Sequence, residues 1–322
     1  MSRFLLPALI ALTALSGSAV QAAPTSVATA GSMRLTLAEL RKRYQQPGDR
    51  YIDVGGVQLR YRDEGKGPVL LLLHGSRSTL NAWDGVAARL KAHYRVVRFD
   101  QPPTGLSGPL SDAARKTIGS PEALVAGFLD KIGVRKTSVF GVSSGGTLAY
   151  YFAGAYPDRV DALILSNTPS DPVGASKLAS TPALDAEAAR SKKQGYEARD
   201  FWSLYLNFLY GDPKRLKPAT IDYYHTINMR VAEPNPFGLH ALTANNALTL
   251  EHLRAVRAPV LILWGMRDQV LPAATAGKAL QSYLVNARSQ SFIALDSVGH
   301  YPPMESPDRV AALVDAWLKR DQ

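Results

Sequence analysis

The chain of 322 residues contains no cysteine, and this absence removes several structural options. Without cysteine there is no disulfide framework and no residue to which a lipid could be attached through sulfur. The protein must therefore take its stability from a hydrophobic core, and a chain of this length can bury a large one.

Motifs for metals and cofactors are also missing. The six histidines are dispersed along the chain, and none belongs to an H-E-x-x-H arrangement. No glycine-rich loop of the kind that binds a dinucleotide or a phosphate is present. We therefore expect neither a metal ion nor a cofactor to take part in the function.

Charge of one sign is not concentrated anywhere, although the formal net charge is +10. Basic clusters such as Arg41-Lys42-Arg43 are scattered among acids, and no basic stripe with interleaved aromatic residues occurs. We therefore do not expect nucleic-acid binding. A mildly basic surface could favour anionic substrates or envelope surfaces, and a simple solvated face is the alternative.

Long apolar runs are rare, and the one at the start of the chain is short. Residues 4–15 form an apolar run, interrupted by Pro7 and Thr13, after a positively charged start and before the small-x-small site Val20-Gln21-Ala22. This run is shorter than the roughly 20 residues of a membrane span. The pattern predicts a signal peptide over residues 1–22, cut after Ala22, with an uncleaved membrane anchor as the alternative. The expected location is periplasmic or secreted, without stable membrane insertion.

Residues 23–50 are expected to form a linker with a short helix over 36–44, because apolar residues in that helix recur at helical spacing. Beyond this linker, the segment 51–62 alternates around Gly55-Gly56, which predicts an antiparallel hairpin at one edge of a sheet.

From residue 69 onward, apolar runs rich in Val, Ile and Leu alternate with helical segments. This alternation predicts an α/β fold with a mostly parallel, doubly wound sheet covered on both faces. The predicted strands are 69–73, 94–99, 138–142, 162–166, 260–264 and 291–295, and the predicted helices are 81–91, 121–132, 144–155, 273–284 and 307–319.

A G-x-S-x-G motif, Gly141-Val142-Ser143-Ser144-Gly145, joins one of these strands to the next helix. A serine on such a turn is held in a strained backbone, with its hydroxyl clear of the sheet edge. Glycines flank it because side chains at those positions would clash with the neighbouring strand and helix. Ser143 is therefore a candidate nucleophile.

An acid and a histidine follow at positions that such a nucleophile needs. Asp268 comes just after strand 260–264, and His300 follows strand 291–295. A serine hydroxyl needs a neutral imidazole as its base and a carboxylate that fixes the imidazole tautomer. All three residues fall beyond the carboxyl ends of predicted parallel strands, where sites in such sheets lie.

Together with four further segments, these motifs resemble the α/β-hydrolase superfamily from about residue 51 to the end of the chain, with a variable middle. The order serine, aspartate, histidine is that of the superfamily's catalytic triad. The further segments are a strand with His-Gly at 69–76, the strand at 94–100, the D-x-x-G-x-G-x-S loop at 100–107, in which Pro103 stands for the first glycine, and His300 followed by Glu305-Ser306-Pro307.

The resemblance implies roles for residues beside the triad. The backbone N–H groups of Ser76 and Ser144 would form the oxyanion hole. His74 would support the oxyanion loop rather than transfer protons. Some superfamily members carry the triad acid one strand earlier, which makes Asp171 an alternative, but Asp268 has the superfamily's Gly-x-x-Asp context.

Between residues 169 and 258 the strand runs stop, and prolines and small residues punctuate helical stretches. We expect residues 169–258 to form a helical cap inserted into an α/β-hydrolase core made of 51–168 and 259–322. The segment 201–210 is dense in aromatic residues, which either line an acyl or aryl pocket or pack the cap onto the core.

The prediction is hydrolysis of a small, hydrophobic carboxylic ester through a triad and an acyl-enzyme. Serine at position 143 argues against epoxide hydrolases and haloalkane dehalogenases, which carry aspartate there. The same triad serves C–C bond hydrolysis of a diketone-like substrate and acyl transfer, so both stay open. A ligand-binding protein on the hydrolase fold is a further alternative, although all three triad positions are retained.

Overall fold

The computed structural model describes residues 34–171, 179–231 and 245–320. The predicted signal peptide, its cleavage site and residues 23–33 of the predicted linker lie outside these ranges, so the signal peptide and its cleavage stay predictions. Within the described ranges, no helix is both long enough and apolar enough to cross a membrane. The same residues contain no group of three or more His, Asp or Glu that could hold a metal ion.

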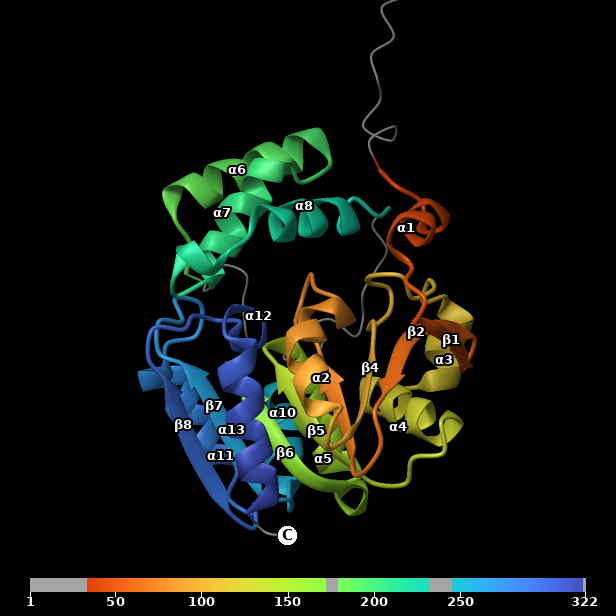
Figure 1. The fold of residues 1–322 in the computed structure, drawn as a ribbon, viewed down its shortest axis with the longest axis vertical. Helices are drawn as coiled ribbons and strands as arrows, with labels where there is room; N and C mark the ends of the chain where they lie inside the picture. The colour runs from red at the N-terminus through yellow and green to blue at the C-terminus, as the bar shows by residue number, and fades with distance from the viewer. Residues whose placement is uncertain (1–33, 172–178, 232–244, 321–322) are drawn as a thin grey trace, which may run out of the picture.

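An eight-stranded sheet forms the centre of the molecule (Figure 1). Its strands are β1 (Arg50–Val54), β2 (Val57–Glu64), β3 (Val69–Leu73), β4 (Arg95–Phe99), β5 (Thr137–Val142), β6 (Val160–Ser166), β7 (Val260–Gly265) and β8 (Gln290–Leu295). Their order in space is β1-β2-β4-β3-β5-β6-β7-β8, in which β1 and β2 pair in the antiparallel sense, as do β2 and β4. All other neighbours are parallel. The predicted fold class and the edge hairpin are confirmed.

Helices cover both faces of the sheet. Those of the described chain are α1 (Leu37–Tyr44), α2 (Asp84–Leu90), α3 (Asp112–Ile118), α4 (Pro121–Lys131), α5 (Ser144–Ala155), α6 (Pro182–Gln194), α7 (Arg199–Leu209), α8 (Pro218–Ile227), α10 (Asn246–Ala255), α11 (Lys278–Tyr283), α12 (Pro302–Glu305) and α13 (Pro307–Lys319). Helices α4, α5, α10 and α11 contribute to the core on one face, and α2 and α13 contribute to the core on the other. Strands such as β7 are buried along their whole length, which explains their unbroken apolar sequences.

Some helical segments differ from the sequence prediction. The segment predicted as helix 273–284 begins as a π-helical turn at Ala273–Gly277 before α11 starts. The segment predicted as helix 81–91 begins as a 3₁₀ turn at Leu80–Trp83 before α2 starts. Helix α3 was not predicted, because Ala114 is its only buried residue and the segment therefore lacks an apolar stripe.

The functional end of the sheet follows from its strand order. The chain leaves β3 toward β4 on one side, and β5 lies on the other side of β3. Ligands of open α/β sheets bind in the crevice beyond the carboxyl ends of the strands at such a switch point. The loop after β3 and the turn after β5 meet there, since a Cβ added to Gly75 would lie 3.1 Å from the Cβ of Ser143.

Helices α6, α7 and α8 form a separate layer over one end of the sheet, and we call this layer the cap (Figure 1). Their own apolar cluster includes Phe201, Trp202 and Tyr224, so many of the cap aromatic rings pack on one another. Helix α10 also falls inside the range 169–258, but it packs on the core helix α5, and its Leu253 is fully buried.

Candidate active site

Ser143 lies on the tight turn between β5 and α5. Its φ of 53° and ψ of −127° belong to a sparsely populated region, as the motif predicted. A Cβ on Gly145 would overlap the carbonyl oxygens of Leu73 and His74, and a Cβ on Gly141 would overlap the carbonyl of Gly145. Only glycine allows the strand and the helix to approach so closely around Ser143.

The structure brings Ser143, His300 and Asp268 into one hydrogen-bonded chain. His300 Nε2 lies 3.0 Å from Ser143 Oγ, and His300 Nδ1 lies 2.8 Å from Asp268 Oδ2. All three residues are buried. When Nδ1–H donates to the carboxylate, Nε2 carries the lone pair that can accept the serine proton.

Asp268 is oriented by more than its histidine partner. Its Oδ1 accepts the backbone N–H groups of Val270 at 2.8 Å and Leu271 at 2.9 Å. Its Oδ2 accepts the side-chain amide of Asn167 at 2.7 Å in addition to the bond with His300. Both oxygens are therefore fixed before a substrate arrives.

Asn167 is a site residue that sequence reasoning missed. It follows β6 directly, with a φ of 44° that asparagine tolerates better than most residues. Its Oδ1 accepts the Gly265 N–H at 3.1 Å, which assigns Nδ2 as the donor to Asp268. The alternative acid Asp171, a few residues further on, is exposed and accepts the hydroxyl of Tyr283 at 3.0 Å.

The two residues expected to form the oxyanion hole lie next to each other. Ser76 Oγ donates to Ser144 Oγ at 3.0 Å, which joins the loop after β3 to the start of α5. Ser144 is the first residue of α5, where backbone N–H groups have no acceptor within the helix and favour negative charge. The structure thus places both residues beside Ser143, and their role as donors stays a prediction.

His74 is held by backbone groups on both ring nitrogens. Its Nε2 accepts the Gln101 N–H at 2.9 Å, so the proton resides on Nδ1, which lies 2.9 Å from the Gly75 carbonyl. Burial lowers the pKa of His74, although the charge of Asp100 and the Gly75 bond act in the opposite direction. A neutral, fully bonded imidazole agrees with the expected supporting role.

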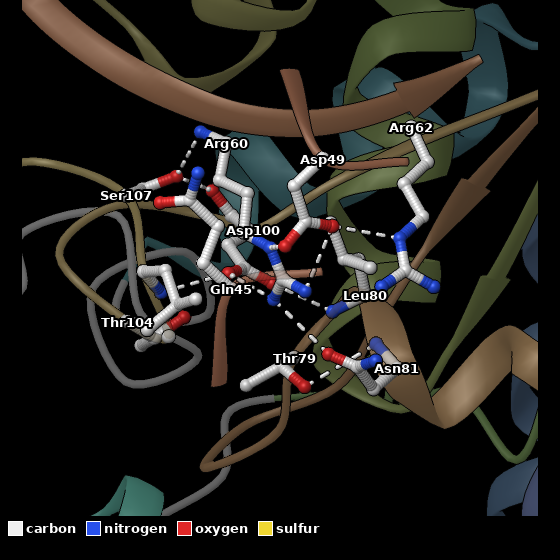
Figure 2. Close-up of polar contacts among 12 residues, drawn as sticks. Gln45, Asp49, Arg60, Arg62, Thr79, Leu80, Asn81, Asp100, Thr104 and Ser107 are labelled. Carbon is white, nitrogen blue, oxygen red and sulfur yellow. Dashed lines mark hydrogen bonds and ion pairs between the residues drawn. The ribbon is translucent and has the colours of Figure 1, made fainter. Parts of the chain in front are cut away.

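A buried network of charged residues lies beside the loop after β3 (Figure 2). Asp100 accepts the backbone N–H groups of Leu80 at 2.7 Å and Leu106 at 2.8 Å. Arg60 is fully buried and pairs with Asp100 at 3.2 Å and with Asp49 at 2.8 Å. Burial raises the pKa of Asp49, but its hydrogen bonds, the strongest of them from Arg60, and the charge of Arg60 together hold the pKa below its ordinary value. The network therefore anchors the end of the loop at Leu80.

Glu305 joins the histidine loop to the cap. Its carboxylate accepts the backbone N–H groups of Gly299 at 2.7 Å and Gly211 at 2.9 Å. The N–H of His300 donates to the carbonyl of Leu209, the last residue of α7, at 2.7 Å. The sequence placed Glu305 in a superfamily motif, but it gave no sign of these contacts.

Comparison of the sequence with known proteins finds one matching family and several related hydrolases. The sequence matches the family described as alpha/beta hydrolase fold over residues 68–307. A 2-hydroxy-6-oxononadienedioate/2-hydroxy-6-oxononatrienedioate hydrolase of Burkholderia vietnamiensis is 27% identical over 283 residues, which cover 84% of this chain and 96% of that protein.

Two solved structures share the fold. A thermophilic esterase from Thermogutta terrifontis has a TM-score of 0.66 at 23% identity and covers 84% of this chain and 98% of its own. A meta-cleavage product hydrolase from Pseudomonas fluorescens IP01 has a TM-score of 0.65 at 20% identity and covers 85% of this chain and 98% of its own.

Proposed function

The chain belongs to the alpha/beta hydrolase family, and we propose that it is a serine hydrolase that cleaves a small, hydrophobic carboxylic ester. The observation that carries the proposal is the hydrogen-bonded chain from Ser143 through His300 to Asp268, with separations of 3.0 and 2.8 Å. The match in fold to the Thermogutta terrifontis esterase supports the same chemistry. No step of this reaction requires a cofactor.

In the proposed mechanism, His300 Nε2 takes the proton of Ser143 as Ser143 Oγ attacks the acyl carbon. Asp268 stabilises the imidazolium that forms, and the N–H groups of Ser76 and Ser144 stabilise the oxyanion. The imidazolium then gives its proton to the leaving alcohol, and an acyl group stays on Ser143. Water activated by His300 finally releases the acid and restores the serine.

A second candidate is hydrolysis of a C–C bond beside a ketone. It is supported by the Burkholderia vietnamiensis relative, whose name specifies an oxo-dienedioate substrate, and by the fold match to the meta-cleavage product hydrolase. The comparisons support this candidate about as well as the esterase. The same serine, histidine and oxyanion donors would serve both reactions.

The experiment that separates these candidates is hydrolysis of p-nitrophenyl esters from acetate to laurate, beside cleavage of a 2-hydroxy-6-oxo-dienoate. For an esterase, we expect ester turnover by the wild type and a loss of at least about 10⁴-fold in Ser143→Ala. The variant Ser282→Ala, at an exposed serine on α11, is the matched control and should keep the wild-type rate.

Two results would change the assignment. Cleavage of the dienoate without ester hydrolysis, again lost in Ser143→Ala, would favour the second candidate. Wild-type turnover by Ser143→Ala would contradict the triad mechanism for both reactions.

A further inference from the structure

The loop that carries Ser76 is hydrogen-bonded to the cap through each of the three residues that follow Ser76. All three partners come from α8 or the residue that ends it. The bonds join Asn228 Nδ2 to the Arg77 carbonyl at 3.0 Å, Tyr224 O–H to Ser78 Oγ at 2.6 Å, and Tyr223 O–H to Thr79 Oγ1 at 2.8 Å.

The side chain of Arg77 reaches a second part of the cap. Its guanidinium forms an ion pair with Glu197, just before α7. It also lies over the rings of Phe201, Trp202 and Tyr205, between 5.4 and 5.9 Å from their centroids. At this range a guanidinium is attracted to the faces of aromatic rings. Arg77 thus contacts α7 while its carbonyl binds the end of α8.

The core holds the same loop at its two ends and at Ser76. The Gly75 N–H donates to the Tyr301 hydroxyl at 2.6 Å, next to His300, the Leu80 N–H donates to Asp100 at 2.7 Å, and Ser76 Oγ donates to Ser144 Oγ at 3.0 Å. The hydrogen bonds from the cap fall on the three residues between Ser76 and Leu80. The conformation of the loop just after Ser76 is therefore tied to the position of α8.

Burial strengthens the case for the tyrosine contacts. Tyr224 is buried and Tyr223 is partly buried, and burial raises the pKa of each phenol well above its ordinary value. Both hydroxyls therefore stay protonated, and a buried hydroxyl without a partner would carry a desolvation cost. Ser78 and Thr79 supply such partners, beside Met304 Sδ at 3.1 Å for Tyr224 and Asn81 Oδ1 at 3.1 Å for Tyr223.

We propose that helix α8 positions the oxyanion loop, with Tyr223, Tyr224 and Asn228 as positioning residues for the Ser76 N–H. The inference rests on the proposed function, because that function gives the Ser76 N–H an oxyanion to stabilise. Such a donor acts only when it lies about 2.7–3.1 Å from the developing charge. A misplacement of about 1 Å can cost about 100-fold in rate. The cap is then part of the catalytic arrangement.

The test uses Tyr224→Phe and Tyr223→Phe, which keep the rings and remove only the hydroxyls. We expect kcat on a p-nitrophenyl ester to fall about tenfold in each, with KM changed by less than about twofold, because the substrate still binds while the donor is misaimed. Tyr196→Phe is the matched control, since the hydroxyl of this cap tyrosine has no hydrogen-bond partner among the described residues. It should keep the wild-type kcat.

A second readout reports on the oxyanion itself. A trifluoromethyl ketone adds to a catalytic serine and places an oxyanion in the hole, so its Ki should rise by the same factor by which kcat/KM falls. Ser78→Ala removes the same bond from the loop side and should reproduce the loss, and the double variant Ser78→Ala/Tyr224→Phe should lose little more. Because Ser78→Ala keeps the tyrosine, it keeps the test decisive if a tyrosine variant does not fold.

Unchanged kcat and Ki in folded Tyr224→Phe and Tyr223→Phe would overturn the inference, even if their melting temperatures fell. A rise in KM alone would also overturn it, because the hydroxyls would then contact the substrate. A failure of the proposed function would give a different result. In that case the single variant Ser143→Ala would still hydrolyse the ester.

Discussion

Asn167 donates its side-chain amide to the same Asp268 oxygen that binds His300, at 2.7 Å. An aspartate at position 167 keeps the tolerance for positive φ but replaces the donor with an acceptor. Two carboxyl groups at this separation cannot both ionise easily, so one of them takes a raised pKa and shares its proton with the other.

We predict that Asn167→Asp changes the pH profile of kcat/KM. While the shared proton is present, the carboxylic acid can donate to Asp268 as the amide did, and activity should stay within about tenfold of wild type. As pH rises through the raised pKa, this proton is lost, the carboxylates repel each other and the orientation of His300 degrades. The alkaline limb should therefore move to lower pH than in wild type. A profile parallel to that of wild type would contradict the role given to Asn167.

The three residues of the proposed triad could be identified from the sequence, whereas the residues that hold them in position through hydrogen bonds could not. Ser143, Asp268 and His300 follow strands in the order of a known triad, and the structure brings them together. Asn167 binds Asp268 and Glu305 binds Gly211, each about 100 positions away in the sequence, and nothing around Asn167 or Glu305 in the sequence indicates these partners.

At the scale of elements, the packing of α5 against β3 depends on Gly145. A methyl group there would overlap the carbonyl oxygens of Leu73 and His74. We predict that Gly145→Ala lowers the free energy of unfolding by at least about 2 kcal/mol, because the well-packed backbone must shift to accept the methyl group. Gly48→Ala is the matched control, since its Cβ would meet nothing within 4 Å, and it should be close to neutral. Urea unfolding of both variants measures the difference, and equal losses would contradict the argument.

The packing of the elements also explains which of them could be predicted well from the sequence. Strands β3 and β7 are apolar throughout because helices cover both faces, and helices α5 and α13 begin and end where predicted. The cap was predicted only as a helical insertion. The bonds from α8 and Asn228 to the loop after β3 join residues 144 to 151 positions apart, and the hydrophobic periodicity of neither segment can predict such a pairing.

At the scale of the whole molecule, the buried His74 and the half-buried His225 and His252 make stability depend on pH. Burial is the main cause that lowers the pKa of His74, His225 and His252 below the ordinary value of 6.5. These rings stay neutral in the folded protein at pH values where the unfolded chain already binds protons. The contribution of these histidines to the free energy of unfolding is therefore fully present above pH 6.5. It is lost as pH falls below that value toward the lower pKa values of the folded protein.

We predict that the free energy of unfolding changes little between about pH 8 and 7 and falls between about pH 6.5 and 5. The buried His74 contributes up to about 1.4 kcal/mol per pH unit if it protonates only on unfolding, and the half-buried His225 and His252 contribute less, because solvent screens their charge. A second loss should begin below about pH 4, because the pKa values of Asp49 and Asp315 are lowered, and their stabilisation disappears when they protonate.

Urea unfolding at half-unit pH steps measures both losses, and His252→Phe assigns part of the first. The His252 ring lies 4.3 Å from the ring of Tyr151, so phenylalanine can keep the aromatic contact while removing the titrating group. The slope between pH 6.5 and 5 should then decrease by the share of one histidine. A free energy that stays constant down to pH 5 would mean that these histidines protonate within the folded protein as readily as in the unfolded chain.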